Sequence, residues 1–177
     1  MTSMHGKGDL ENWVRTTLPR ALGYARAVLR DQIAAEDVVQ DCYVRLIEHA
    51  DRYDLLRDGL KILLRSVFHA CLDRVTRERS LLSLDDTPNG THDICDRSSP
   101  DPPQEAMAHE LSDRIERALA KLPVGQRAAV HLAALGYSLP EVADIMGTTH
   151  GNARVLVHRA RKSLEAELES FLMGGET

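Results

Sequence analysis

The chain has 177 residues, a formal net charge of −5 and 4% aromatic residues. This length suits one or two small domains that each bury a core, and the acidic balance excludes a protein that coats nucleic acid through bulk positive charge. The three cysteines are widely spaced without a CxxC pair, and no apolar run approaches the roughly 18 residues of a membrane span.

Few aromatic residues and long stretches of helical periodicity favour an all-α protein. The first residues, MTSMHGKGDLENW, lack the apolar core of a signal peptide. Together with the cysteine pattern, this predicts a cytoplasmic protein in a reducing environment. We expect no metal, no cofactor and no membrane insertion.

The first periodic stretch extends from about Asp9 to Arg30, where apolar residues recur every three or four positions. Pro19 lies in the middle of this stretch. A proline there either kinks one helix or begins a second helix. Both outcomes are compatible with the sequence.

A strongly amphipathic helix is expected after Asp31, in AAEDVVQDCYVRLIEHADRY. Its apolar face consists of Val38, Val39, Cys42, Leu46 and Ile47. The opposite face carries Glu36, Asp37, Gln40, Asp41 and Arg45. A metal or acid–base site is disfavoured here because no histidine or further carboxylate stands at ligand spacing, and acids near a helix start are favoured by its dipole. The acidic face is therefore either a docking surface for a positively charged partner or an ordinary solvated surface.

A long helix is expected from about Asp58 to residue 82, and it ends in a basic run with Arg74, Arg77 and Arg79. Its expected buried residues are Leu60, Leu63, Leu64, Val67, Phe68, Cys71, Leu72 and Val75. Cations near a helix C-terminus complement the helix dipole, and they also suit phosphate groups. The same arginines satisfy both interpretations.

Residues 83–107 differ in composition, with four of the seven prolines, six acidic residues and one basic residue. Without helical or strand periodicity, they are predicted to form a flexible linker that spans roughly 25–30 Å as a coil. Its acidic side chains either keep the tether soluble or occupy a basic channel of a partner in place of nucleic acid. They are Asp85, Asp86, Asp93, Asp96 and Asp101.

Two more helices are expected after the linker. The first begins at Ala108 and stops at Pro123, with an apolar face of Leu111, Ile115, Ala118, Leu119 and Leu122. The second covers residues 126–135 and ends at Gly136. Both should pack under the segment that follows to complete a four-helix domain.

The stretch from Ser138 to Leu164 is predicted to form two helices joined by a tight turn. Ser138 and Glu141 have the spacing of a capping box, and Gly147 has the position of a helix-ending glycine. Thr148 or Thr149 caps the second helix. This pattern is typical of a helix-turn-helix, whose second helix enters the major groove of DNA. An ordinary helical hairpin with a solvated basic face has the same periodicity.

In that second helix Ala153, Leu156 and Val157 are expected to face inward. The residues expected to contact DNA lie on the outer side, where some reach bases and the cations meet phosphates. They are His150, Asn152, Arg154, Val155, His158, Arg159, Arg161 and Lys162.

These segments, taken in order, resemble the extracytoplasmic-function group of bacterial RNA polymerase sigma factors. AEDVVQDCYVRLIEH resembles the family's second conserved region, and the stretch from residue 118 to 164 resembles its fourth region, including Leu122, Pro123 and Arg127. The resemblance implies an all-α fold with two small helical domains, residues 9–82 and 108–172, joined by the linker of residues 83–107. It also implies a role in promoter-specific transcription initiation, without catalysis.

The resemblance assigns partners as well. Glu36, Asp37, Gln40 and Asp41 are expected to bind the clamp helices of the largest subunit of core RNA polymerase. Arg74, Arg77 and Arg79 are expected to engage the downstream promoter element. The second helix of the helix-turn-helix is expected to engage the upstream element. Small sigma factors of this group are commonly held by an anti-sigma factor, which is a further expected partner.

The chain departs from the family pattern at some positions. Ile62 replaces a frequent tryptophan, Phe68 and His69 replace an arginine–asparagine pair, and residues 151–156 read GNARVL. We therefore expect a promoter preference that differs from the family's common one. The competing hypothesis is a degenerate sigma-like adaptor that binds a regulator or partner without initiating transcription.

Overall fold

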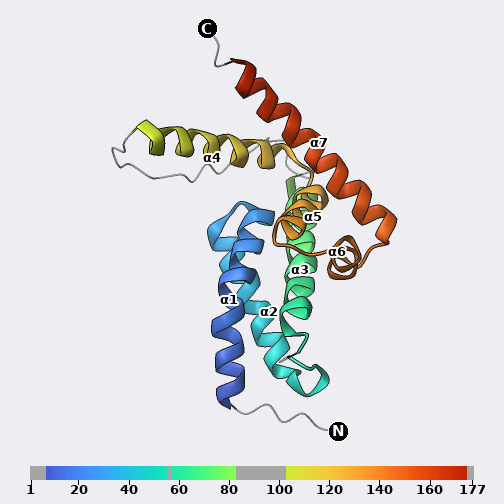
Figure 1. Ribbon diagram of the computed structural model, residues 1–177. Helices are drawn as coiled ribbons and strands as arrows, with labels where there is room; N and C mark the ends of the chain where they lie inside the picture. Colours follow the sequence, from blue (N-terminus) through green and yellow to red (C-terminus); the bar gives the residue numbers. More distant parts are fainter. Residues whose placement is uncertain (1–6, 56, 83–102, 175–177) are drawn as a thin grey trace.

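The computed structural model describes residues 7–55, 57–82 and 103–174, which form seven α-helices and one short 3-10 helix and contain no strand (Figure 1). In chain order they are α1 (Lys7–Leu29), α2 (Gln32–Glu48), η1 (Ala50–Arg52), α3 (Gly59–Leu82), α4 (Pro103–Lys121), α5 (Val124–Ala134), α6 (Leu139–Met146) and α7 (His150–Gly174). The all-α prediction is confirmed. Residues 83–102, with Cys95 and the five linker aspartates, lie outside this part of the chain.

The front domain is a bundle of α1, α2 and α3, each of which packs against the other two. Its core contains aromatic side chains. The Trp13 and Tyr43 rings meet edge to face at 5.2 Å between centroids, and the Tyr43 hydroxyl shares a 2.7 Å hydrogen bond with the Thr17 hydroxyl. These contacts join α1 to α2.

Helix α1 continues through Pro19 without dividing in two. Proline lacks an N–H group, so one backbone hydrogen bond is missing at this position. One turn earlier, the Thr16 hydroxyl donates to the Asn12 carbonyl at 2.9 Å and the Thr17 hydroxyl donates to the Trp13 carbonyl at 2.7 Å. Of the two outcomes left open by the sequence, the structure has the single helix.

The junctions between the front helices are tight. Helix α1 ends at Leu29, and the next residue, Arg30, has a left-handed φ of 59°. Asp31 then caps α2 by accepting a hydrogen bond from the Ala34 N–H at 2.9 Å. Helix α3 starts at Gly59, where a Cβ would collide with the indole of Trp13. The glycine thus allows α3 to approach α1 closely.

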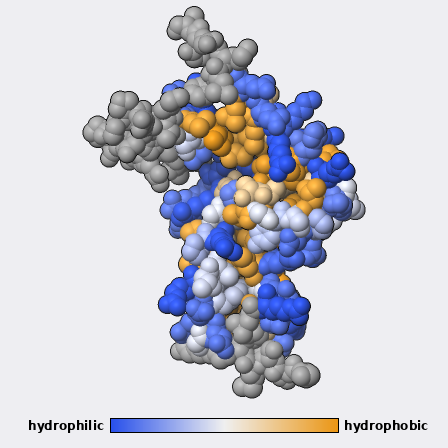
Figure 2. All heavy atoms as spheres, viewed as in Figure 1, coloured by the Kyte–Doolittle hydropathy of each residue, from blue (hydrophilic) through white to orange (hydrophobic). Residues whose placement is uncertain are grey.

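The rear domain contains α4 to α7 and has a core of smaller side chains. α5 and α6 both pack against α7, and α4 packs against α7 as well. Its buried apolar residues are Ala118, Leu122, Ala128, Ala129, Leu132, Val142, Ala143, Ile145, Met146, Ala153, Val157 and Ala160. Figure 2 shows apolar residues gathered where α4, α5 and α7 meet, while hydrophilic residues cover most of the front domain in this view.

The two domains are packed against each other. α5 lies against α1, and α6 lies against α3, so that one apolar cluster continues from the front core into the rear core (Figure 1). The Tyr24 ring of α1 and the His131 ring of α5 meet across this boundary at 5.9 Å. We call the α1–α5 and α3–α6 contacts the seam. Helical periodicity does not predict this contact between the domains.

Four predicted core positions are wrong. Ile47, Leu72, Leu111 and Ile115 are exposed, whereas Tyr43 is buried on α2. Ile47 and Leu72 lie at the margin of an apolar stripe, where periodicity does not distinguish a buried position from an exposed one. Leu111 and Ile115 share one face of α4 with Ala118 and Leu122, and periodicity does not say how much of such a face is covered. Helix α4 also begins at Pro103, inside the range assigned to the linker.

Candidate nucleic-acid interface

The predicted helix-turn-helix is formed by α6 and α7. Glu141 accepts hydrogen bonds from both the backbone N–H of Ser138, at 2.9 Å, and its hydroxyl, at 2.7 Å. These bonds lower the pKa of the Glu141 carboxyl below its ordinary value. Gly147 then ends α6 with a left-handed φ of 63°. The helix start and the turn are as predicted.

Thr149 caps α7, because its hydroxyl accepts the Asn152 N–H at 3.2 Å. The Asn152 side chain donates to the Thr148 hydroxyl at 2.8 Å, which fixes the first turn of the helix. Ala153 and Val157 are buried and Leu156 is half-buried, so the inward face is as predicted. All the residues predicted to face DNA are exposed, namely His150, Asn152, Arg154, Val155, His158, Arg159, Arg161 and Lys162.

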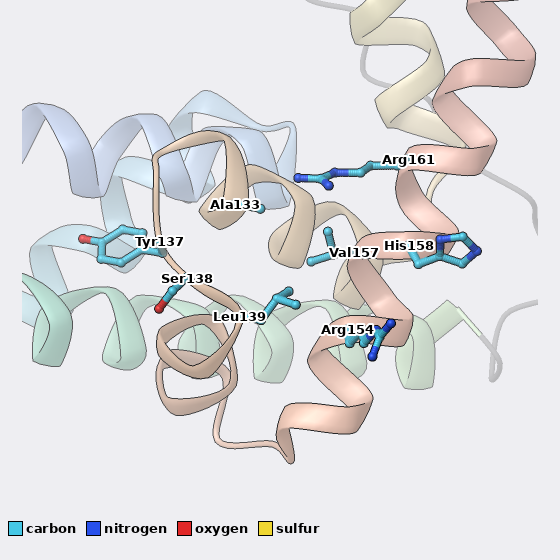
Figure 3. Close-up of a pocket in the computed structure, with 8 residues that line it drawn as sticks. All are labelled: Ala133, Tyr137, Ser138, Leu139, Arg154, Val157, His158 and Arg161. Atoms are coloured by element: carbon cyan, nitrogen blue, oxygen red, sulfur yellow. The ribbon is translucent and has the colours of Figure 1, made fainter.

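Three of these residues line a pocket of about 400 Å³ on the α5–α6–α7 surface. Arg154, His158 and Arg161 come from successive turns of α7 and surround it with Tyr137 and Ser138 (Figure 3). Arg154, Arg159, Arg161 and Lys162 make no ion pair within the described part of the chain. Unpaired cations on the exposed side of such a helix suit contacts with phosphates and base edges.

The basic end of α3 differs, because one of its three arginines is already engaged. Arg74 pairs with Glu78 at 3.2 Å and approaches Asp37 of α2 at 4.0 Å. Arg77 and Arg79 are exposed. Two of the three predicted DNA-contacting arginines on α3 are therefore presented to solvent without a partner among the described residues.

The predicted polymerase-binding residues lie on the exposed side of α2. Glu36, Asp37, Gln40 and Asp41 are all exposed. Glu36 pairs with Arg26 of α1 at 2.9 Å, and hydrogen bonds from Arg26 and then Gln32 lower the pKa of its carboxyl. The structure brings these four residues together on one helix surface.

The same surface of α2 carries exposed apolar side chains that the sequence analysis did not select. Ile33 is 71% exposed and Val44 is 49% exposed. Ile47, which was predicted to be buried, completes the series. Their spacing of eleven and three residues returns to one side of a helix, so a signal was present in the sequence. Apolar residues among polar ones are typical of binding surfaces.

The positions that depart from the family pattern have different environments. Among those in the front domain, Phe68 is buried in the core, Ile62 is half-buried and His69 is exposed. The Phe68 side chain is thus removed from any DNA-facing surface.

Nothing in the described ranges forms a metal site, since no group of three His, Cys, Asp or Glu side chains is placed to hold an ion. Cys42 and Cys71 are free and buried. Burial raises the pKa of their thiols, to about 11 and about 12 respectively. Thiols of this kind are unreactive.

Each of the two domains matches a known protein family. The models for Sigma-70 region 2 and Sigma-70, region 4 match residues 13–80 and 112–164. The ECF RNA polymerase sigma factor SigM of Mycobacterium tuberculosis is 32% identical over 156 residues, which are 85% of this chain and 72% of that protein. The chain belongs to the extracytoplasmic-function (ECF) sigma factors. The resemblance seen in the sequence is confirmed.

Other relatives agree with this assignment. The ECF sigma factor SigW of Bacillus subtilis is 27% identical over 143 residues, which cover 77% of this chain and 76% of SigW. Among solved structures, the sigma factor RpoE of Bartonella quintana, in complex with the anti-sigma factor NepR, has a TM-score of 0.72 at 21% identity and covers 91% of this chain and 97% of its own. CnrH, in complex with the cytosolic domain of CnrY, has a TM-score of 0.63 at 24% identity, and the match covers 93% of this chain and 90% of CnrH. The two solved structures establish the fold.

As an ECF sigma factor, the chain binds core RNA polymerase and promoter DNA and directs promoter-specific transcription initiation. Members of this family act by binding, so family membership indicates a protein that is not an enzyme. Within the described residues, no helix combines the length and the apolar composition that crossing a membrane requires.

Proposed function

We propose that the two domains of this sigma factor divide initiation between them. The exposed side of α2 binds the clamp helices of the largest polymerase subunit through Glu36, Asp37, Gln40 and Asp41. The end of α3 binds the downstream promoter element, and the exposed side of α7 binds the upstream element. The chain itself carries out no chemistry and acts in the cytoplasm.

The observation that carries this proposal is the state of the α7 arginines. Arg154 and Arg159 are exposed on the outer side of a capped second helix, and neither is paired with a carboxylate in the described residues. An arginine in that position reaches base edges or phosphates when the helix lies in a major groove. The polymerase-binding role of α2 is supported by its exposed acidic residues and by the apolar Ile33 and Val44 beside them.

An anti-sigma factor is a further proposed partner. The solved structure of RpoE from Bartonella quintana is a complex with the anti-sigma factor NepR, and it shares its fold with this chain over 97% of its length. A partner of this kind would hold the chain away from polymerase until it is released.

Crossed variants test the division of labour. Asp37→Arg reverses a charge on α2 and should abolish co-purification with core polymerase, while binding to an upstream-element duplex is unchanged. Arg154→Ala should leave co-purification with core polymerase unchanged. It should lower the affinity for the specific duplex tenfold to hundredfold, roughly the effect of one base contact of about 1–3 kcal/mol. The matched controls are Asp51→Arg and Arg117→Ala, which change exposed residues that belong to neither proposed set.

The salt dependence of DNA binding separates two roles for Arg154. If it reads a base, Arg154→Ala weakens the specific duplex far more than a scrambled one. If it contacts phosphate, both duplexes lose affinity equally and the salt slope decreases by about one. Retention of core binding by Asp37→Arg, or of upstream binding by Arg154→Ala on every duplex, would overturn the corresponding assignment.

A further inference from the structure

The outward side of α7 has an apolar side chain at its centre. Val155 is 42% exposed, and among residues 150–169, whose side chains the structure describes, it is the only large apolar residue that is exposed. The core-facing side of the same helix is marked by Ala153, Val157 and Ala160, which are buried. Because successive residues of an α-helix are turned by about 100°, Val155 points almost directly away from those three residues. It therefore faces whatever lies against the exposed side of α7.

The exposed stripe that contains Val155 is open on one side and basic on the other. Gly151, one turn earlier, has no side chain, and a Cβ at that position would meet nothing within 4 Å. Arg159, one turn later, and Lys162, two turns later, are exposed. The glycine leaves room for the flat edge of a base pair to approach Val155, while the two cations lie further along the helix, where phosphates can reach them.

Two neighbouring side chains are held by the protein itself. The Asn152 amide donates a 2.8 Å hydrogen bond to the Thr148 hydroxyl, so it is turned back towards the start of α7. An asparagine reads adenine when its amide faces outward and pairs bidentately with the base. Leu156 is half-buried and packs against the apolar core. Of the GNARVL stretch, all of which the structure describes, this leaves the Arg154 and Val155 side chains to meet a base pair.

An apolar side chain on this surface has one apolar counterpart in the major groove. Every base pair presents hydrogen-bond donors or acceptors there, and thymine also presents its 5-methyl group. A valine side chain forms no hydrogen bond, so against a donor or acceptor it would displace water and leave that group unpaired. Against a methyl group, both apolar surfaces leave water together, which is favourable. Uracil and cytosine lack this methyl group.

We propose that Val155 is a specificity-determining residue of this sigma factor, and that it selects a pyrimidine with a 5-methyl group, which is thymine in ordinary DNA, in the upstream element. The inference rests on the proposed binding of the upstream element by α7, and it names a base that this surface selects. Because the Val155 side chain carries no charge, its contribution to binding is independent of salt, unlike that of a cation that contacts phosphate.

Base analogues that differ by one methyl group test the contact. The probe is a promoter selected from a randomised library by core polymerase that carries the full chain, and each thymine of its upstream element, on either strand, is replaced in turn by deoxyuridine. At one position the replacement should weaken binding about fourfold, roughly the effect of one buried methyl group. At the same position 5-methylcytosine should bind about fourfold more tightly than cytosine, for the same reason.

A valine variant identifies the side chain that makes the contact. In Val155→Ala, the deoxyuridine and 5-methylcytosine effects at that position should both fall below about 1.5-fold, because a double-mutant cycle removes changes that do not involve this side chain. The salt slope of binding should stay unchanged. The matched control is Leu135→Ala, which shortens an exposed apolar side chain at the end of α5 and should keep both fourfold effects.

The outcomes separate this inference from the proposed function. An upstream element selected without thymine would overturn the inference, and so would deoxyuridine effects that are equal in the unsubstituted chain and Val155→Ala. If Arg154→Ala still weakens binding in either case, the division of labour stands and only the thymine contact is lost. If Arg154→Ala binds every duplex as the unsubstituted chain does, the α7 assignment fails, and the Val155 inference fails with it.

Discussion

The front and rear domains solve the same packing problem with different side chains. The front core contains Trp13, Tyr24, Tyr43 and Phe68, and it leaves the Trp13 Nε1 and the Tyr24 hydroxyl buried without partners. The rear core is rich in alanine, including Ala128 and Ala129 on α5. Small residues allow helices to approach closely, so α5 can pack on α7 and on α1 together. The small core of the rear domain is therefore completed by contact with the front domain.

The largest expected effect concerns one of the few large side chains in the rear core. Leu132→Ala creates a cavity beside alanines that cannot fill it, and should lower the free energy of unfolding by about 2–5 kcal/mol. Urea denaturation measures this loss. Leu135→Ala, at an exposed position on the same segment, should change stability by less than about 0.5 kcal/mol. Equal losses from both variants would show that the rear core is not organised around Leu132.

A substitution in the front core should have the opposite sign. Tyr24→Phe removes a buried hydroxyl that has no partner and keeps the ring against His131. Because an unsatisfied buried polar group costs roughly 1–3 kcal/mol, the variant should be more stable by an amount in that range. Thermal unfolding of the two proteins gives the difference. Destabilisation would indicate that the hydroxyl has a partner such as bound water.

A smaller gain is expected where the front domain meets Arg127. Arg30 has a left-handed φ, and its charge lies close to the Arg127 guanidinium. Arg30→Gly relieves a backbone strain of about 1 kcal/mol and removes the like charge. Arg30→Ala removes only the charge, so the difference between the two variants in urea denaturation isolates the backbone contribution. Equal stability of the two variants would show that the backbone at this position is unstrained.

The smallest expected effect is a pH dependence of the free energy of unfolding that arises from His131 at the seam. Burial lowers the pKa of His131 below its ordinary value of 6.5, so the unfolded chain binds this proton more readily than the folded chain. Its contribution to stability is complete above pH 6.5 and declines as the pH falls from 6.5 towards the lowered value. His131→Gln should flatten the stability profile between pH 7.5 and about 5.5. The depressed pKa of Glu141 acts only at lower pH, below its ordinary 4.5, and is a separate transition.

Much of the DNA-binding site was determined by local sequence. Ser138, Glu141, Gly147 and Thr149 act on neighbouring backbone groups, so a helix-turn-helix with an exposed Arg154 could be predicted from the order of residues. The family resemblance also depended on such local patterns. The roles of individual residues in binding polymerase and DNA stay predictions.

What only the tertiary structure decided is which surfaces meet. Arg127 belongs to a short motif in the sequence, and the motif is the same whether its guanidinium faces solvent or the Val28 carbonyl ninety-nine positions away. Helical periodicity specifies that an apolar stripe is buried, but not against which helix, and it does not fix the margins of the stripe, as Ile47 and Leu72 show. The seam arises from long-range packing between two stripes, and no local interaction encodes that choice.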